Sequence, residues 1–187
     1  MSGKTLRYEI AESMREIVFG LEDSFVSTLG AVTGIAAGAQ STAVVILSGF
    51  VIVSVEALSM AAGSYLSNKS AQEAEDAVLK ETGKSRERFG EHIMRSAVVM
   101  GVTYTLGGMV PLAPYFFLPI SQAYLPSIVL TGLCLFALGA WASSFSKKRS
   151  AWTGGWHMVV VSLSAAALGF LIGRAVNAYY GGTLIGV

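Results

Sequence analysis

Residues 25–66 read FVSTLGAVTGIAAGAQSTAVVILSGFVIVSVEALSMAAGSYL, an apolar stretch that contains a single charged side chain, Glu56. A helix needs about 20 mostly apolar residues to cross the hydrocarbon core of a bilayer, so this stretch is too long for one crossing. Its only polar cluster is QST at 40–42, which predicts a tight turn. Two membrane-spanning helices are therefore expected, at about 18–39 and 43–66.

Three further apolar segments are long enough to span a membrane, and they lie at 97–118, 124–145 and 152–173. The 187 residues are 53% hydrophobic and only 13% charged. That charged share is about half the roughly 25% that is typical of soluble domains. The sequence thus predicts an all-α integral membrane bundle of five transmembrane helices, forming one membrane domain over 1–187.

The basic residues predict how this bundle is oriented. Twelve of the thirteen Lys and Arg residues precede the first span or follow the second or the fourth span. Cytoplasmic segments carry the excess of basic residues, so the N-terminus is expected in the cytoplasm and the C-terminus outside. Arg174 is the exception, and its long side chain can reach the outer interface.

Two segments on the predicted cytoplasmic side are expected to be helical without spanning. Residues 5–18 repeat apolar side chains at helical spacing, which is typical of an amphipathic helix on the membrane surface. Residues 67–95 form a short cytoplasmic connection, with a helix expected at 70–82 that ends at Gly83. The acidic residues within 70–92 either form a solvated helix face or capture metal, and the sequence leaves both open.

Ionisable side chains inside two of the spans are the candidate functional residues. A charge in a span costs at least about 2.5–3.5 kcal/mol and normally faces the bundle interior or a water path. Counted from the turn, Ser27 and Glu56 each lie about 20 Å deep, and Asp23 and Met60 about 25 Å. Because the two helices are antiparallel neighbours, these four residues are expected to form a polar cluster in two layers.

Two carboxylates and a thioether point to a divalent metal ion, and the thioether favours softer ions such as Fe²⁺. Metal binding displaces protons from its ligands, so the same residues can exchange a metal ion for protons. Plainer interpretations stay open: Asp23 as an interfacial cap or anchor, Glu56 as a hydrogen-bonded structural group, and Met60 as a lipid-facing or core-packing residue.

Glycines recur at every fourth position in the first span, at 30, 34 and 38, and again at 169 and 173 in the fifth. Such stripes let another helix backbone approach closely. The sequence leaves open whether that contact lies across a dimer or inside the bundle. Pro111, Pro114 and Pro119 predict a kink or break near the outer end of the third span.

Other classes of function find no support in the sequence. Cys134 is the only cysteine, which excludes an intrachain disulfide or a cysteine-built metal site. The net charge of +1 makes no case for a nucleic-acid partner. No phosphate loop, nucleophile elbow or catalytic triad is present, so the chain is not expected to be an enzyme and needs no cofactor other than a transported metal ion.

Two motifs resemble the vacuolar iron transporter (VIT) family. The first is EDSFVSTLG at 22–30, and the second is SMAAGSYLS at 59–67, which is similar to the family's M-A-x-G-E-Y-x-S. The family's acidic residue is Ser64 here, and we infer that Glu56, two turns deeper, replaces it. The connection after the second span is also short for the family, which makes this chain a short-loop member and leaves open its divalent substrate.

The resemblance implies a homodimer that moves Fe²⁺, and often Mn²⁺, out of the cytosol in exchange for H⁺. It implies that Asp23 and Met60 are ligands along the pathway. We therefore expect proton-coupled metal export, with Asp23, Glu56, Met60 and Ser27 as the metal-binding residues. The alternatives are a proton-coupled carrier of a small organic solute and a non-transporting membrane assembly subunit. The expected location is a prokaryotic plasma membrane, or alternatively a vacuolar-type membrane.

Overall fold

The computed structural model describes residues 13–39, 41–81, 90–144 and 150–180, and all regular elements within them are helices. These elements are α2 (Met14–Gly38), α3 (Thr42–Glu81), α4 (Gly90–Leu112), the 3₁₀ helix η1 (Ala113–Phe116), α5 (Ile120–Ser144) and α6 (Ala151–Tyr180). The predicted all-helical class is therefore confirmed. Most of the predicted surface helix at 5–18 lies outside the described residues, and its last turn belongs to α2.

Four helices in the described part of the chain are long and apolar enough to cross a membrane, judged by length and composition. They are Thr42–Lys80, His92–Phe116, Ile120–Ser144 and Ala151–Tyr179. They correspond to the second to fifth predicted spans. The remaining long helix, α2, is not among them, and it carries the charged residues Glu22 and Asp23 within its apolar part.

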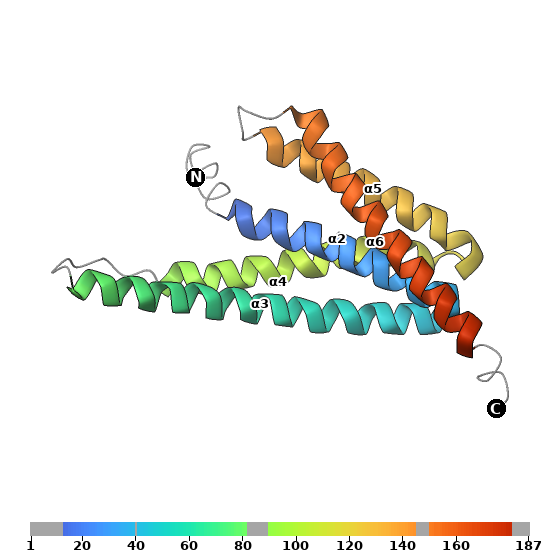
Figure 1. The fold of residues 1–187 in the computed structure, drawn as a ribbon, viewed down its shortest axis with the longest axis horizontal. Helices are drawn as coiled ribbons and strands as arrows, with labels where there is room; N and C mark the ends of the chain where they lie inside the picture. Colours follow the sequence, from blue (N-terminus) through green and yellow to red (C-terminus); the bar gives the residue numbers. More distant parts are fainter. Residues whose placement is uncertain (1–12, 40, 82–89, 145–149, 181–187) are drawn as a thin grey trace.

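Helix α2 occupies the centre of the arrangement. The helices α3 and α4 lie side by side, α5 and α6 form a second pair, and α2 runs between the two pairs (Figure 1). It contacts all four of these helices. At one end of the bundle α2 begins, α3 ends, α4 begins, α5 ends and α6 begins (Figure 1). Several polar residues of α2, namely Glu16, Ser24, Thr28 and Thr33, are therefore buried by the other helices.

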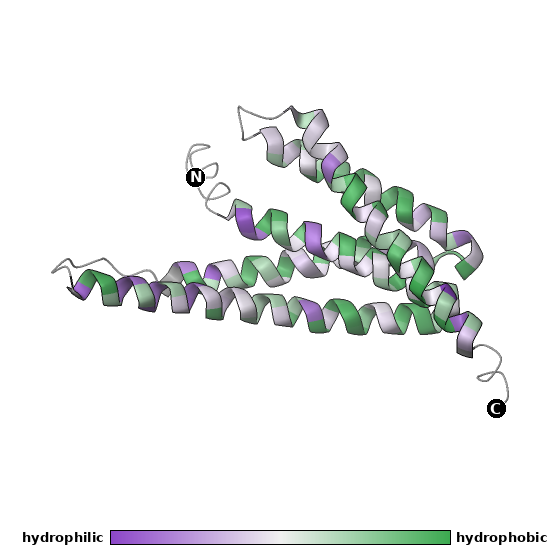
Figure 2. Ribbon diagram, in the orientation of Figure 1, coloured by the Kyte–Doolittle hydropathy of each residue, from purple (hydrophilic) through white to green (hydrophobic). Residues whose placement is uncertain are grey.

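Helix α3 is longer than the sequence analysis predicts. The prediction places a span at 43–66 and a separate helix at 70–82, whereas the structure has one unbroken helix of 40 residues. The segment after 69 is rich in Ala, Glu and Gln, which are strong helix formers, so nothing ends the helix near the membrane boundary. The hydropathy colours turn more purple over this C-terminal part of α3 (Figure 2). The predicted stop at Gly83 lies outside the described residues.

The predicted break near the end of the third span is present. Helix α4 ends at Leu112, one residue after Pro111, and the chain continues as the 3₁₀ helix η1. In a 3₁₀ helix the backbone hydrogen bonds join residues three apart, whereas in an α-helix they join residues four apart, so the bonding pattern changes just after Pro111. The Ser127 hydroxyl of α5 donates a hydrogen bond of 2.6 Å to the Pro111 carbonyl oxygen. This buried bond ties α5 to the end of α4.

The glycine stripes of α2 and α6 pack against each other within one chain. A Cβ atom built on Gly34 would lie 2.7 Å from the Gly169 carbonyl oxygen, and one on Gly173 would lie 2.0 Å from the Gly34 carbonyl oxygen. Only glycine allows two backbones to come this close. The question that the sequence leaves open is thus answered in favour of packing inside the bundle.

Candidate functional site between α2, α3 and α4

Glu56 of α3 is the centre of a polar cluster to which three helices contribute. The Ser27 hydroxyl of α2 donates a hydrogen bond of 3.1 Å to Oε2 of Glu56. The Tyr104 hydroxyl of α4 donates to the same oxygen. The hydroxyl oxygens of Ser27 and Tyr104 lie 2.6 Å apart. The Ser27–Glu56 bond agrees with the helix register that the sequence predicts from the turn between α2 and α3.

The cluster has fewer hydroxyl protons than short oxygen–oxygen contacts. Ser27 and Tyr104 each carry one hydroxyl proton, whereas three oxygen–oxygen pairs lie within bonding distance. With Glu56 ionised, at most two of the three contacts are hydrogen bonds at any moment. The arrangement can therefore rearrange its protons without moving a helix, which suits a site that gains and loses a positive charge.

Asp23 adds a second carboxylate on the same face of α2. It lies one turn before Ser27, and residues four apart share a helix face. Its side chain is partly buried, and its charge interacts with that of Glu56. Two like charges held near each other in a poorly solvated place repel, and a cation between them relieves that repulsion. Asp23 and Glu56 together thus favour binding of a positive ion.

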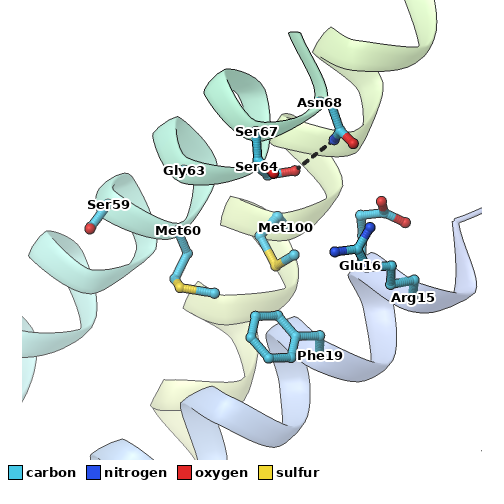
Figure 3. Close-up of a pocket in the computed structure, with 10 residues that line it drawn as sticks. All are labelled: Arg15, Glu16, Phe19, Ser59, Met60, Gly63, Ser64, Ser67, Asn68 and Met100. Atoms are coloured by element: carbon cyan, nitrogen blue, oxygen red, sulfur yellow. Dashed lines mark hydrogen bonds between the residues drawn. The ribbon is translucent and has the colours of Figure 1, made fainter. Parts of the chain in front are cut away.

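Met60 lines an adjoining pocket. Among the described residues, no hydrogen bond joins it to Ser27 or Asp23. It is one turn along α3 from Glu56, on the same helix face. The pocket has a volume of about 360 Å³ and is lined by residues of α2, α3 and α4, including Met60, Met100 and Glu16 (Figure 3). The structure therefore brings Ser27, Glu56 and Asp23 together and places Met60 beside them.

Tyr104 is the residue of this cluster that the sequence analysis does not identify. It is fully buried, with 0% of its surface exposed, although its hydroxyl is polar. A single tyrosine inside an apolar span is a weak signal, because tyrosine is also common as packing. Among the described residues, no group of three or more His, Cys, Asp or Glu side chains is placed to hold a metal ion. The cluster is built from two carboxylates and neutral oxygen or sulfur groups.

Several known proteins are similar to this chain over most of their length. An uncharacterized protein of Methanocaldococcus jannaschii is 30% identical over 171 residues, which cover 86% of this chain and 88% of that protein. Vacuolar iron transporter homolog 1 of Arabidopsis thaliana is 29% identical, with 84% of each chain covered. Vacuolar iron transporter 1 of Eucalyptus grandis is 22% identical, covering 93% of this chain and 90% of that transporter.

A family model gives the broader comparison. The model described as the VIT family matches residues 14–92 and 81–174, so the matched segments include α2 and all of the functional cluster. The resemblance that the two sequence motifs predict is confirmed. The chain belongs to the VIT family.

Proposed function

We propose that this protein exports divalent transition metal, Fe²⁺ and also Mn²⁺, from the cytosol in exchange for protons. The observation that carries the proposal is a pair of carboxylates, Asp23 on α2 and Glu56 on α3, that interact electrostatically within an apolar bundle, with Glu56 bonded to Ser27 of α2. Ionisable groups in such a position normally mark an ion pathway. Relatives named vacuolar iron transporters support metal as the cargo.

Exchange follows from the chemistry of the ligands. Carboxylates bind a metal ion only after they lose their protons, so a metal ion that enters from the cytosol releases protons there. After the site opens to the other side, the metal ion leaves and protons return to Asp23 and Glu56. Ser27 and Tyr104 can bond to Glu56 whether its carboxylate is ionised or protonated. Their hydroxyls donate hydrogen bonds to the ionised form, and one of them can accept a hydrogen bond from the protonated form. Met60 favours soft ions over Mg²⁺ and Ca²⁺.

The proposed topology has five spans, including α2, with the N-terminus in the cytoplasm. The central place of α2 supports this count, since a helix that is surrounded by four others needs less apolar surface than a lipid-facing helix. We also propose that the protein is a homodimer in a prokaryotic plasma membrane, with a vacuolar-type membrane as the alternative. The archaeal relative and the plant relatives are compatible with either location.

Metal flux into proteoliposomes tests this function. Purified protein is reconstituted, Fe²⁺ and Mn²⁺ are offered separately, and the internal pH is recorded. We expect metal entry with proton movement in the opposite direction. Absence of flux for both ions, from protein shown to be folded, would contradict the proposal.

A matched pair of variants tests the mechanism in the same vesicles. Glu56→Gln keeps the shape of the side chain but removes the exchangeable proton, so proton-coupled flux is expected to disappear. Glu73→Gln removes a carboxylate from an exposed position of the same helix, where the side chain is 69% exposed and pairs with Lys69. Its flux is expected to match the parent. Normal flux in Glu56→Gln would show that Glu56 does not carry the exchange.

A further inference from the structure

The pocket beside the polar cluster has features of a second ion-binding site. It lies where α2 begins, which is the end of the bundle that we propose to be cytoplasmic. Its walls come from three helices, with Glu16 from α2, Met60 and Ser64 from α3, and Met100 from α4 (Figure 3). The pocket is one helical turn beyond Glu56, because Met60 lies four residues after it.

Glu16 is a buried carboxylate with an unused oxygen. Only 7% of its surface is exposed, and its Oε2 atom is buried without a hydrogen-bond partner in the described part of the chain. A buried, unpaired carboxylate oxygen is costly, so native structures normally provide a partner for it. The neighbouring Thr103 hydroxyl does not bond this atom: its shortest hydrogen bond, of 2.7 Å, goes to the Val99 carbonyl oxygen, and it reaches Glu16 only at the backbone carbonyl oxygen, at 3.4 Å. A cation in the pocket would supply the missing partner.

Two thioethers determine which cation fits. The side chains of Met60 and Met100 both turn toward the pocket next to Phe19 (Figure 3). Met100 is buried, with 6% of its surface exposed. Thioether sulfur binds softer metals, whereas Mg²⁺ and Ca²⁺ prefer oxygen ligands alone. One carboxylate with two thioethers and nearby serine hydroxyls therefore suits Fe²⁺ better than either of those ions.

We propose that this pocket binds the transported metal ion before it reaches Asp23 and Glu56, through the Glu16 carboxylate and the thioethers of Met60 and Met100. The inference rests on the proposed function. Met60 lies between the two sites and is shared by both, so the ion passes from Glu16 to Glu56 without losing all its protein ligands. The pocket thus selects the ion at the entrance, and the carboxylate pair couples it to protons.

Arg15 also lines the pocket, and replacing it is expected to affect metal binding in the opposite direction to replacing Glu16. Its side chain is exposed, and no ion pair with Glu16 occurs in the residues that the structure describes. A positive charge in the wall opposes a bound cation. Removing that charge is therefore expected to tighten metal binding, whereas removing the charge of Glu16 weakens it.

The experiment measures Mn²⁺ on the purified full-length protein and in proteoliposomes. Free Mn²⁺ is counted by its electron paramagnetic resonance signal, which gives the number of ions bound per chain, and initial flux gives KM and the maximal rate. Losing a supporting group around a metal ligand alone weakens binding by 10–100-fold, so losing the ligand is expected to raise KM by at least about tenfold. Glu16→Gln should thus show a raised KM and one fewer bound ion, with its maximal rate retained. Arg15→Gln should lower KM.

Two further variants separate binding from packing. Met100→Leu nearly conserves volume, the kind of change that cores tolerate best, and it is expected to reduce the preference for Fe²⁺ over Mn²⁺. Met94→Leu is its control, because Met94 lies on the same helix, is 56% exposed and does not line the pocket. Equal effects of these two variants on ion preference would overturn the role of Met100.

The outcomes distinguish this inference from the proposed function. If the parent transports metal and Glu16→Gln leaves both KM and the number of bound ions unchanged, the pocket inference is wrong and the function stands. A raised KM in Glu73→Gln with none in Glu16→Gln would place the entrance on the exposed part of α3 and would also overturn it. If neither the parent nor any variant transports metal, yet Mn²⁺ binding is lost in Glu16→Gln and kept in Glu56→Gln, the pocket is supported and the transport function fails.

Discussion

Replacing Gly169 by alanine is expected to push α2 and α6 apart. The new methyl group would lie 1.9 Å from the carbonyl oxygen of Gly30. Ordinary contact begins at 3.4 Å, so the two helices must separate locally by about 1.5 Å. The opposing atom belongs to the backbone, and no side-chain rotation can relieve the clash. Overpacking of this kind costs about 1–3 kcal/mol, which is the expected loss in the free energy of unfolding.

Gly132→Ala is the matched control for this substitution. Gly132 lies inside α5, and no heavy atom is within 4 Å of the position that its Cβ would occupy. Alanine is more favourable than glycine inside a helix by about 0.8–1 kcal/mol. The control is therefore expected to be as stable as the parent or slightly more stable. The chemical change is identical in both variants, and only the surroundings differ.

Unfolding by SDS in mixed micelles measures the difference. All three tryptophans, Trp141, Trp152 and Trp156, lie on α5 and α6, so their fluorescence reports on the α6 region. Circular dichroism checks that helix content falls in the same transition. A Gly169→Ala variant within about 0.5 kcal/mol of the parent would refute the close α2–α6 contact. So would an equal loss in Gly132→Ala, because the effect would then come from glycine removal in general.

Two further predictions concern single hydrogen bonds. A double-mutant cycle that combines Tyr104→Phe with Glu56→Leu is expected to give a coupling of at least about 1 kcal/mol in SDS unfolding, because the hydroxyl donates to the carboxylate. A coupling near zero would mean that the two groups do not bond. Ser127→Ala leaves the Pro111 carbonyl without its donor and is expected to cost about 1–3 kcal/mol. Ser164→Ala removes an exposed bond within α6 and serves as its control, with a change below about 0.5 kcal/mol expected.

The sequence predicts the helices well because their signals are local. Apolar runs of sufficient length and the polar turn near residue 40 are enough to place α2 and α3, and the count from that turn pairs Ser27 with Glu56. The end of α3 is predicted less well. Water and helix-forming residues support a helix beyond the membrane boundary, and hydropathy alone marks only where the apolar part ends.

The remaining site residues depend on packing that no local pattern reveals. Glu16 looks like one charge of a polar N-terminal segment, and only the approach of α3 and α4 makes it a buried pocket residue. Met100 is one of seven methionines in the chain, and spacing does not distinguish it from packing residues. The sequence also does not show which helix packs against the glycine stripe of α2, since a stripe predicts only that some helix approaches closely.

The length of α3 has a mechanical consequence. Its 40 residues extend about 60 Å, roughly twice the thickness of the hydrocarbon core. Glu56 is about 21 Å from the start of the helix. If α3 rocks as a lever about that start, its far end moves nearly three times as far as Glu56 does. A spectroscopic label on the exposed far part of α3 would therefore magnify small shifts of the partly buried Glu56 into displacements that distance measurements can resolve.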